Sequence, residues 1–233
     1  MNSRNQVQRP RLALFDLDHT LLPLDSDFEW GEFSIRIGWA DKQEFGRRNQ
    51  AFYEDYVAGT LDVHDYVRFA TEAVRRHGAQ QAASAHERFM DEVIRPAIQP
   101  AARNLLRSHH EAGDEIVIIT ATNEFVTAPI AREFGVSNLI AVQLERDASG
   151  WITGEIDGIP SMRDGKVRRM EAWLKERGLG WDDVECTFYS DSVNDVPLLE
   201  KVQHPVATNP DARLRALALQ KGWRILDLFP QKP

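Results

Sequence analysis

Two aspartates, Asp16 and Asp18, stand two residues apart directly after the apolar run "RLALF". Residues two apart in an extended chain point to the same side, so both carboxylates can address one ligand. Two like charges beside a hydrophobic core are unfavourable unless a cation or a proton offsets them. A D-x-D alone is more often a turn or a cap, so the prediction of a site depends on what the rest of the chain places beside this pair.

Short apolar runs alternate with helical patterns over most of the chain, which is typical of a mostly parallel sheet covered on both faces. The predicted strands cover 11–16, 114–120, 184–191 and 204–209. The predicted helices cover 100–112, 124–134 and 163–177, and each is followed by a glycine. Asn209, Pro210 and Asp211 are interpreted as the N-cap and first turn of a further helix. The predicted fold class is α/β, with a Rossmann-like parallel-sheet core.

Polar side chains follow these strands at the carboxyl edge, where ligands bind in open parallel sheets. Thr120 ends the second strand, Asp191 and Asp195 follow the third in "SDSVND", and Lys166 begins the helix between the two. Each has an ordinary structural alternative: a helix cap for the threonine and for "SDSVND", and a solvated position for the lysine. Their convergence with the first two aspartates at one edge of the sheet favours a functional site.

This set of four carboxylates, one hydroxyl and one ammonium suits phosphoryl chemistry. Clustered carboxylates cannot all stay ionised without a cation, and oxygen ligands suit Mg²⁺, which often also binds a substrate phosphate. A lysine and a hydroxyl can offset the remaining charge of a phosphoryl group. One aspartate can act as nucleophile and a second as general acid and base. We therefore expect a magnesium-dependent reaction on a small-molecule phosphate ester.

A long helical segment interrupts the alternation after the first strand. Four stretches with helical patterns fill residues 25–95, between Pro23 and Pro96. They are predicted to form a four-helix-bundle insert that overhangs the end of the first strand. The chain then divides into a core, residues 1–22 and 97–233, and an insert, residues 23–96. A second irregular segment, 139–158, contains the turn signal "ASG" and is predicted to form a hairpin at the sheet edge.

Composition narrows the class of protein. The 233 residues are enough for a sizeable core, and a net charge of -8 argues against nucleic acid as a partner. The single cysteine, Cys186, excludes an internal disulfide and is expected to be buried in "VECTFY". No segment approaches the roughly 20 apolar residues of a membrane span. The first residues lack the apolar core of a signal peptide, so we expect a soluble cytoplasmic protein.

These residues resemble the motifs of the haloacid dehalogenase (HAD) superfamily of phosphohydrolases. "FDLDHT" is similar to its first motif, D-x-D-x-T, and "SDSVND" to its fourth, G-D-x-x-x-D. Thr120 after "IVII" matches the second motif, and Lys166 in "DGKVRRM" matches the third. A helical insert between the first two motifs resembles the family's type 1 cap. Over nearly the whole chain, the sequence looks most like the phosphoserine-phosphatase-like subgroup.

The resemblance implies a role for each aspartate. Asp16 is the expected nucleophile, which forms an aspartyl-phosphate. Asp18 is the expected general acid and then base, and its backbone carbonyl is expected to bind Mg²⁺ together with the Asp16 carboxylate. Asp191 is expected to complete the protein ligands of the metal. Asp195 is expected near the metal, through water or a lysine.

The resemblance also implies which residues surround the phosphate. Thr120 and the backbone N–H of Ala121 are expected to hold phosphoryl oxygens. Lys166 is expected to offset the charge on the nucleophile and the phosphate, and Asn194 to reach the substrate or phosphate.

The resemblance leaves the substrate open between phosphoserine and histidinol phosphate. Asp25 falls where phosphoserine phosphatases carry a glutamate that binds the substrate's amine, although it can equally cap the first insert helix. The run "DSDFEW" also resembles a branch that includes histidinol-phosphate phosphatases. Ser190 in place of the fourth motif's glycine, and His19 in place of a small residue, loosen the assignment to phosphoserine.

Two further expectations concern the insert. A substrate that carries a carboxylate needs a cationic partner, and the candidates there are Arg47, Arg48 and Arg68. Trp30 can stack on an imidazole or, as an apolar helix residue, belong to the core.

Other classes of protein use similar residues. A response-regulator receiver also combines a phospho-accepting aspartate with a threonine, a lysine and Mg²⁺, but it lacks a D-x-D and a helical insert. A dehalogenase on the same fold does not need Asp18, and a non-catalytic binding protein would be expected to have lost Asp16 or Asp18. A phosphotransferase or phosphomutase keeps both aspartates and stays open as an alternative to a phosphomonoesterase.

Overall fold

A six-stranded parallel sheet forms the centre of the molecule. The computed structural model describes residues 9–230, and the predictions for residues 1–8 and 231–233 lie outside that range. The strand order is β3-β2-β1-β6-β7-β8. The strands are β1 Arg11–Phe15, β2 Glu115–Asn123, β3 Asn138–Val142, β6 Glu185–Ser190, β7 His204–Thr208 and β8 Arg224–Leu226. β1 lies in the middle because Leu14 pairs with Val117 on one side and Phe188 on the other. The predicted α/β core is confirmed.

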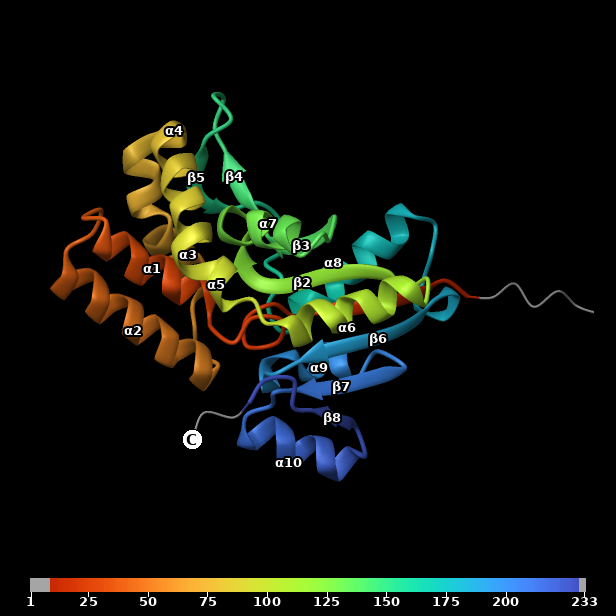
Figure 1. The fold of residues 1–233 in the computed structure, drawn as a ribbon. Coiled ribbons are helices and arrows are strands. Elements are labelled where there is room, and N and C mark those ends of the chain that lie inside the picture. The colour runs from red at the N-terminus through yellow and green to blue at the C-terminus, as the bar shows by residue number, and fades with distance from the viewer. Residues whose placement is uncertain (1–8, 231–233) are drawn as a thin grey trace, which may run out of the picture.

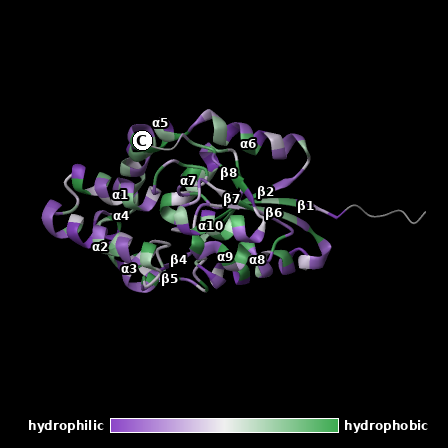
Figure 2. Cartoon of the chain, turned by 90° about the horizontal axis from the view of Figure 1, so that it is seen from below, coloured by the Kyte–Doolittle hydropathy of each residue, from purple (hydrophilic) through white to green (hydrophobic). Residues whose placement is uncertain are grey.

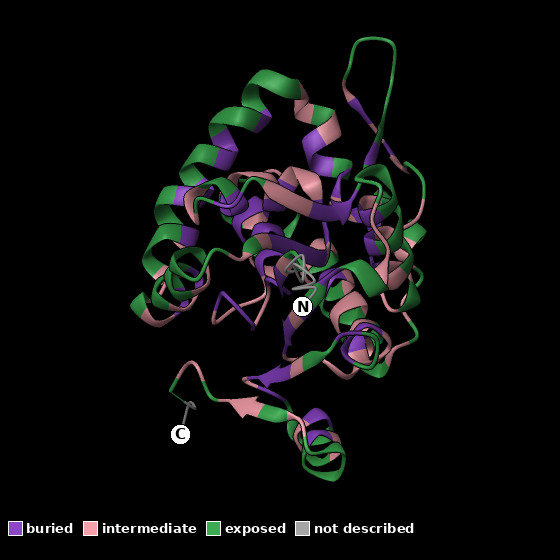
Figure 3. Ribbon diagram, turned by 90° about the vertical axis from the view of Figure 1, so that its right-hand side faces the viewer, coloured by how far each residue is buried: buried purple, intermediate pink, exposed green. Residues whose placement is uncertain are grey.

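Helices cover both faces of this sheet (Figure 1). One face packs against α6 Pro100–Glu111 and α7 Glu124–Glu133, and the other against α8 Asp164–Glu176, α9 Val196–Leu199 and α10 Ala212–Lys221. Ala13 and Phe15 of β1 enter the first layer, while Leu12 and Leu14 enter the second. Strands buried on both faces are apolar at every position, which explains the continuous run "LALF". Figure 3 shows the buried residues concentrated along these strands.

Two sequence predictions, one about a strand end and one about a helix cap, are wrong. β2 does not end at Thr120 but continues to Asn123 across a shift in register that begins after Ile119. Asn209 is not an N-cap, because Asp211 caps α10 by accepting from the backbone N–H of Leu214 at 2.7 Å. Asn209 instead adopts a positive φ of 48°.

The segment 139–158 is also only partly a hairpin. Its first residues belong to β3, an edge strand of the parallel sheet that pairs with β2. The hairpin is the separate pair β4 Leu144–Arg146 and β5 Ile152–Ile156. The sequence pattern did not indicate β8, which is only three residues long. Cys186 is buried as predicted.

Between β1 and β2 the chain is helical. The helices are α1 Ser26–Arg36, α2 Lys42–Ala58, α3 Val63–Ala70 and α4 Glu72–Phe89, followed by a π-helical turn Met90–Ile94 and the short α5 Arg95–Ala97. One of the four stretches with a helical pattern, residues 61–78, is not a single helix. Instead α3 ends at Ala70, and Gly78 interrupts α4 with a non-helical φ of 75°. Figure 2 shows hydrophobic colour on the inner strands and more hydrophilic colour on these outer helices.

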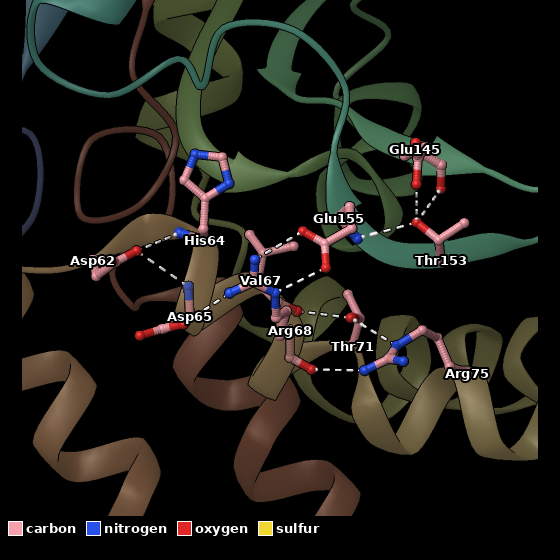
Figure 4. A network of polar contacts seen from close by, with 10 residues as sticks. All are labelled: Asp62, His64, Asp65, Val67, Arg68, Thr71, Arg75, Glu145, Thr153 and Glu155. Atoms are coloured by element: carbon pink, nitrogen blue, oxygen red, sulfur yellow. Dashed lines mark hydrogen bonds and ion pairs between the residues drawn. The ribbon is translucent and has the colours of Figure 1, made fainter.

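The helical segment packs against the hairpin through α3 (Figure 4). Arg68 donates from Nε and Nη2 to the two carboxylate oxygens of Glu155 on β5, at 2.8 and 3.1 Å. Arg75 in turn donates from Nη2 to the backbone carbonyl of Arg68 at 3.0 Å. These groups are exposed, so the ion pair contributes about 1 kcal/mol or less. Its clearer consequence is that Arg68 points toward the hairpin.

Candidate active site

A buried lysine joins two of the predicted aspartates at the carboxyl edge of the sheet. Lys166 Nζ lies 2.7 Å from Asp16 Oδ1 and 2.6 Å from Asp195 Oδ2, and the three residues are at most 6% exposed. Gly165 permits this arrangement, because the carbonyl oxygen of Pro160 would lie 2.0 Å from any Cβ at that position. The glycine of "DGK" therefore lets the first turn of α8 approach a neighbouring loop and deliver Lys166 to the site.

The charges in this trio are mutually dependent. Burial raises the pKa of Asp16 and of Asp195, and Lys166 lowers both. Burial lowers the pKa of Lys166, but the two carboxylates raise it more strongly, so that it exceeds the ordinary value. The lysine therefore remains a cation, and removing it would leave two buried carboxylates without this counter-charge.

Thr20 connects Asp16 with Asp191, another of the four predicted aspartates. Its Oγ1 lies 3.3 Å from Asp16 Oδ2 and 3.5 Å from Asp191 Oδ1, and it accepts from the backbone N–H of Asp191 at 3.1 Å. Burial raises the pKa of Asp191 well above its ordinary value, and Asp16 raises it further. Sequence reasoning did not single out Thr20, although it is the threonine of D-x-D-x-T.

The carboxyl group of Asp18 accepts hydrogen bonds from both α1 and β2. Its Oδ1 accepts from the backbone N–H of Ser26 at 2.7 Å, and its Oδ2 accepts from Thr122 Oγ1 at 2.9 Å. Burial, with a further contribution from Asp25, raises the pKa of Asp18 to about 6. Thr122 was missed by sequence reasoning. Its signal was a second threonine two residues after Thr120, and therefore on the same side of the chain.

These orientations determine which groups can hold a cation. Among residues 9–230, no three side chains of the types His, Cys, Asp and Glu have metal-binding geometry. Asp18 is engaged as above, and Asp195 accepts from Lys166 and from Ser190 Oγ, the latter at 2.7 Å. The side chains of Asp16 and Asp191 remain, and burial raises the pKa of both carboxyl groups, with a further contribution from Asp16 at Asp191. Two hard carboxylates supplemented by a backbone carbonyl suit Mg²⁺, which keeps several waters.

The three residues predicted around the phosphate do not all line the cavity that contains Asp16. Thr120 and Ala121 line the same cavity as Asp16, and Thr120 Oγ1 accepts from the backbone N–H of Thr122 at 3.1 Å. Asn194 does not line this cavity. Its Nδ2 donates to the backbone carbonyl of Tyr56 on α2 at 3.1 Å.

The other half of the cavity comes from α1, α2 and α3. Asp25 caps α1, because its Oδ1 accepts from the backbone N–H groups of Asp27 and Phe28 at 3.0 and 2.9 Å, and it also lines the cavity. Asp27 is 7% exposed and accepts from Asn123 Nδ2 at 3.3 Å. Burial, with the charge of Asp25, raises the pKa of Asp27 to about 8. Aromatic rings complete this wall: Phe28, Phe52, Tyr53, Tyr56 and Tyr66.

None of the described residues that line this cavity is an arginine or a lysine. The three arginines considered for a substrate carboxylate lie elsewhere: Arg68 pairs with Glu155, Arg47 with Glu44 at 3.4 Å, and Arg48 lies over the ring of Phe69 at 4.4 Å. Trp30 is 2% exposed and packs between core aromatic rings, outside the cavity. The wall is therefore acidic and aromatic.

The parallel sheet and the aspartates at its carboxyl edge are typical of an α/β enzyme that carries out phosphoryl chemistry. The family model of haloacid dehalogenase-like hydrolases matches residues 13–200, and the chain belongs to this family. It is 44% identical to a protein of Neisseria meningitidis named histidinol-phosphatase, over 93% of this chain and 98% of that protein. It is 33% identical to a phosphoserine phosphatase of Mycobacterium tuberculosis, over 92% of this chain and 70% of that protein.

Solved structures agree with this assignment. A Bordetella pertussis protein described as of unknown function is 50% identical, with a TM-score of 0.89 over 95% of this chain and 100% of that chain. A substrate-bound phosphoserine phosphatase is 16% identical, with a TM-score of 0.62 over 94% of this chain and 93% of that chain, which shows a shared fold. The protein is a phosphoric monoester hydrolase of the HAD family. Within residues 9–230, no helix has the length and apolarity of a membrane span.

Proposed function

We propose that this phosphatase hydrolyses a small amine-bearing phosphate monoester, with histidinol phosphate as the leading substrate. The observation that carries the proposal is the wall formed by α1, α2 and α3, which offers two acidic side chains and several aromatic rings. Phosphoserine carries a carboxylate, which this wall would repel. Both esters carry an amine, but histidinol phosphate has a flat imidazole and no carboxylate. Its amine and its imidazole suit acidic and aromatic surroundings.

Two acidic residues of this wall are assigned to the two nitrogen-bearing groups of histidinol phosphate. The charge of Asp25 raises the pKa of both Asp18 and Asp27, so Asp25 lies near the proposed acid and base as well as near Asp27. In the substrate, the amine lies nearer the phosphate ester than the imidazole does. We assign the amine to Asp25, and the imidazole to Asp27 together with the hydroxyl of Tyr66. The 44% identical relative named histidinol-phosphatase supports the same choice.

The proposed reaction has two steps at phosphorus. A carboxylate oxygen of Asp16 attacks phosphorus, the bond to the ester oxygen breaks, and Asp18 donates a proton to the leaving alcohol. Water then attacks the aspartyl-phosphate, Asp18 takes a proton from that water, and the bond to Asp16 breaks to release phosphate. Lys166 holds Asp16 in place throughout, and Thr120 and Ala121 bind phosphoryl oxygens.

A divalent cation belongs in this proposal because of the donor set. The Asp16 and Asp191 side chains, with the backbone carbonyl of Asp18, are the groups we assign to Mg²⁺. When bound, the ion offsets negative charge on the phosphoryl group and on the two carboxylates. Residues 23–96 are proposed to be a cap domain that selects the substrate, on a core formed by the rest of the chain.

The test is Mg²⁺-dependent phosphate release from histidinol phosphate, phosphoserine and p-nitrophenyl phosphate. We expect kcat/KM for histidinol phosphate to exceed that for phosphoserine by about 100-fold, because a buried carboxylate next to Asp25 would lack a partner. Chelation of the metal should abolish turnover. A preference for phosphoserine would replace this proposal with a phosphoserine phosphatase, the activity named for the 33% identical relative. Phosphate transfer to a second substrate without release would indicate a phosphotransferase.

A further inference from the structure

The C-terminal end of α2 is bound by side chains from separate segments of the core. Asn194, in the loop after β6, donates from Nδ2 to the carbonyl of Tyr56 at 3.1 Å. Arg213, in the first turn of α10, donates from Nη2 to the carbonyl of Val57 at 3.0 Å. These contacts join residues 138 and 156 positions apart in the sequence. We call the two side chains, Asn194 and Arg213, the α2 latch.

The latch supplies what α2 itself lacks. The last carbonyls of a helix have no partner within the helix, and the same end carries a partial negative charge that cations stabilise. α2 has no basic residue in its own last turn. Arg213 provides that positive charge, and the guanidinium of Arg163 is a second one close by.

Gly59 shows how closely the core approaches this helix end. It ends α2 in the left-handed region with a φ of 78°. A Cβ at this position would lie 2.8 Å from Arg163 Nη2 and 3.6 Å from Asn194 Oδ1. The left-handed φ favours glycine here, and the side chains of Arg163 and Asn194 lie directly against it.

The bound end of α2 also carries side chains of the active site. Tyr53 and Tyr56 line the catalytic cavity, and burial together with the charges of Asp16 and Asp191 raises the pKa of Tyr56 well above its ordinary value. A second cavity lies on the outer side of these tyrosines. It shares Tyr53, Tyr56 and Asp191 with the catalytic cavity and is bordered by Asn194 and Arg213. Movement of the α2 end away from the latch would therefore open the aspartates to this side.

We propose that Arg213 is a positioning residue for the phosphatase reaction. Through Val57, and together with Asn194, it fixes the end of α2 against the core and so keeps Tyr53 and Tyr56 over the catalytic aspartates. Arg213 touches neither substrate nor reacting atoms. Its effect is on the population of the closed arrangement, and therefore on substrate binding. The proposal does not depend on which phosphate ester is the natural substrate.

The test compares R213A with R213K and with R215A, using p-nitrophenyl phosphate. R215A is the matched control, because Arg215 lies on the same helix but pairs with Asp227 of the core. We expect R213A to raise KM about fivefold while kcat changes less than twofold. The variant loses a half-exposed guanidinium that donates to the Val57 carbonyl at 3.0 Å and to Asp211 at 3.4 Å. R213K keeps a cation at the helix end and should recover part of the loss. R215A should leave KM unchanged.

Hydrogen exchange gives a second readout at the helix end. The backbone N–H groups of Gly59 and Thr60 bond to carbonyls of Tyr56 and Asp55 at 3.1 and 2.9 Å. We expect these amides to exchange faster in R213A than in R215A. An R213A enzyme with unchanged KM and unchanged exchange at residues 59–60 would overturn the proposal, whatever its melting temperature. So would a KM increase of the same size in R215A. If R213A does not fold, R213Q takes its place in both comparisons.

Discussion

The catalytic cavity has a core half and a helical half, and buried carboxylates have different partners in the two. On the core side, Lys166 contacts Asp16 and Asp195 at 2.7 and 2.6 Å, so that two carboxylates share a buried cation. On the side of the helical segment, the hydrogen-bond donors that the described residues offer to Asp25 and Asp27 are neutral backbone N–H, amide and hydroxyl groups. The core half carries the groups that we propose handle the phosphoryl group. In the same proposal, the positive charge for the helical half comes from the substrate.

The largest expected effect is at the nucleophile. D16N keeps the size of the side chain but removes the oxygen that is proposed to attack phosphorus. We expect turnover of every phosphate ester to fall by roughly 10⁴-fold or more. Steady-state kinetics on histidinol phosphate and p-nitrophenyl phosphate, with circular dichroism as the folding control, measures this. Retained turnover on either ester would show that the core half does not work as proposed.

Loss of the shared cation should affect stability as well as activity. K166M leaves Asp16 and Asp195 buried without the cation that they share, which costs on the order of 3–5 kcal/mol at neutral pH. K175M is the matched control, because Lys175 lies on the same helix and is exposed; its effect should stay within about 0.5 kcal/mol. Urea unfolding of both variants gives the two free energies. A K166M enzyme as stable as K175M would mean that the lysine is not holding the core half together.

The helical half should show its uncompensated charge as a pH dependence of stability. Asp27 is faced by Asp25 and Asp18 as charges and by Tyr66 and Asn123 as neutral donors. Its folded-state pKa of about 8 lies above the ordinary value of 3.8, so the folded state binds the proton more tightly. The stability that this bound proton contributes is fully present below pH 3.8. It is lost as the pH rises toward 8, at up to about 1.4 kcal/mol per pH unit.

D27N removes that dependence. As the pH rises from 5 to 8, we therefore expect the free energy of unfolding of the wild type to fall relative to that of D27N, by on the order of 1–3 kcal/mol. Urea unfolding at the two pH values measures this, with the exposed Asp65 changed to Asn as the control. A constant difference between D27N and the wild type over this range would show that Asp27 is not held neutral by its surroundings.

The core half could be predicted from the sequence to a greater extent than the helical half. Parallel strands place their carboxyl ends at one edge, so Asp16, Lys166 and Asp191 were placed near one another by topology alone. Asp18 and Asp195 were assigned to the same edge, but their orientation toward Thr122 and Ser190 was not predictable. Asp18 is oriented by a hydrogen bond from Thr122, 104 residues away in the sequence, and Asp195 by one from Ser190, only 5 residues away. Strand topology specifies neither contact, because both depend on how the loop side chains settle.

The helical half could be anticipated only as a set of helices. Helical periodicity located α1 and α2, but it does not say which turns face the core, because that depends on how the helices pack. Tyr53, Tyr56 and Tyr66 were therefore missed as lining residues, and Asn194 was assigned to the substrate although it contacts α2. Asp25 was left open between two roles. The structure shows the helix cap, and its place in the cavity leaves the substrate contact as a proposal.

The most direct test of the division between the two halves is the selectivity of D25N. Asparagine is as good a helix cap as aspartate, so α1 keeps its first turn while the carboxylate proposed to face the substrate's amine is lost. We predict that kcat/KM for histidinol phosphate falls about 30-fold relative to kcat/KM for p-nitrophenyl phosphate, the cost of one buried charged hydrogen bond. Equal losses on the two esters would contradict the proposal and leave Asp25 as a helix cap alone.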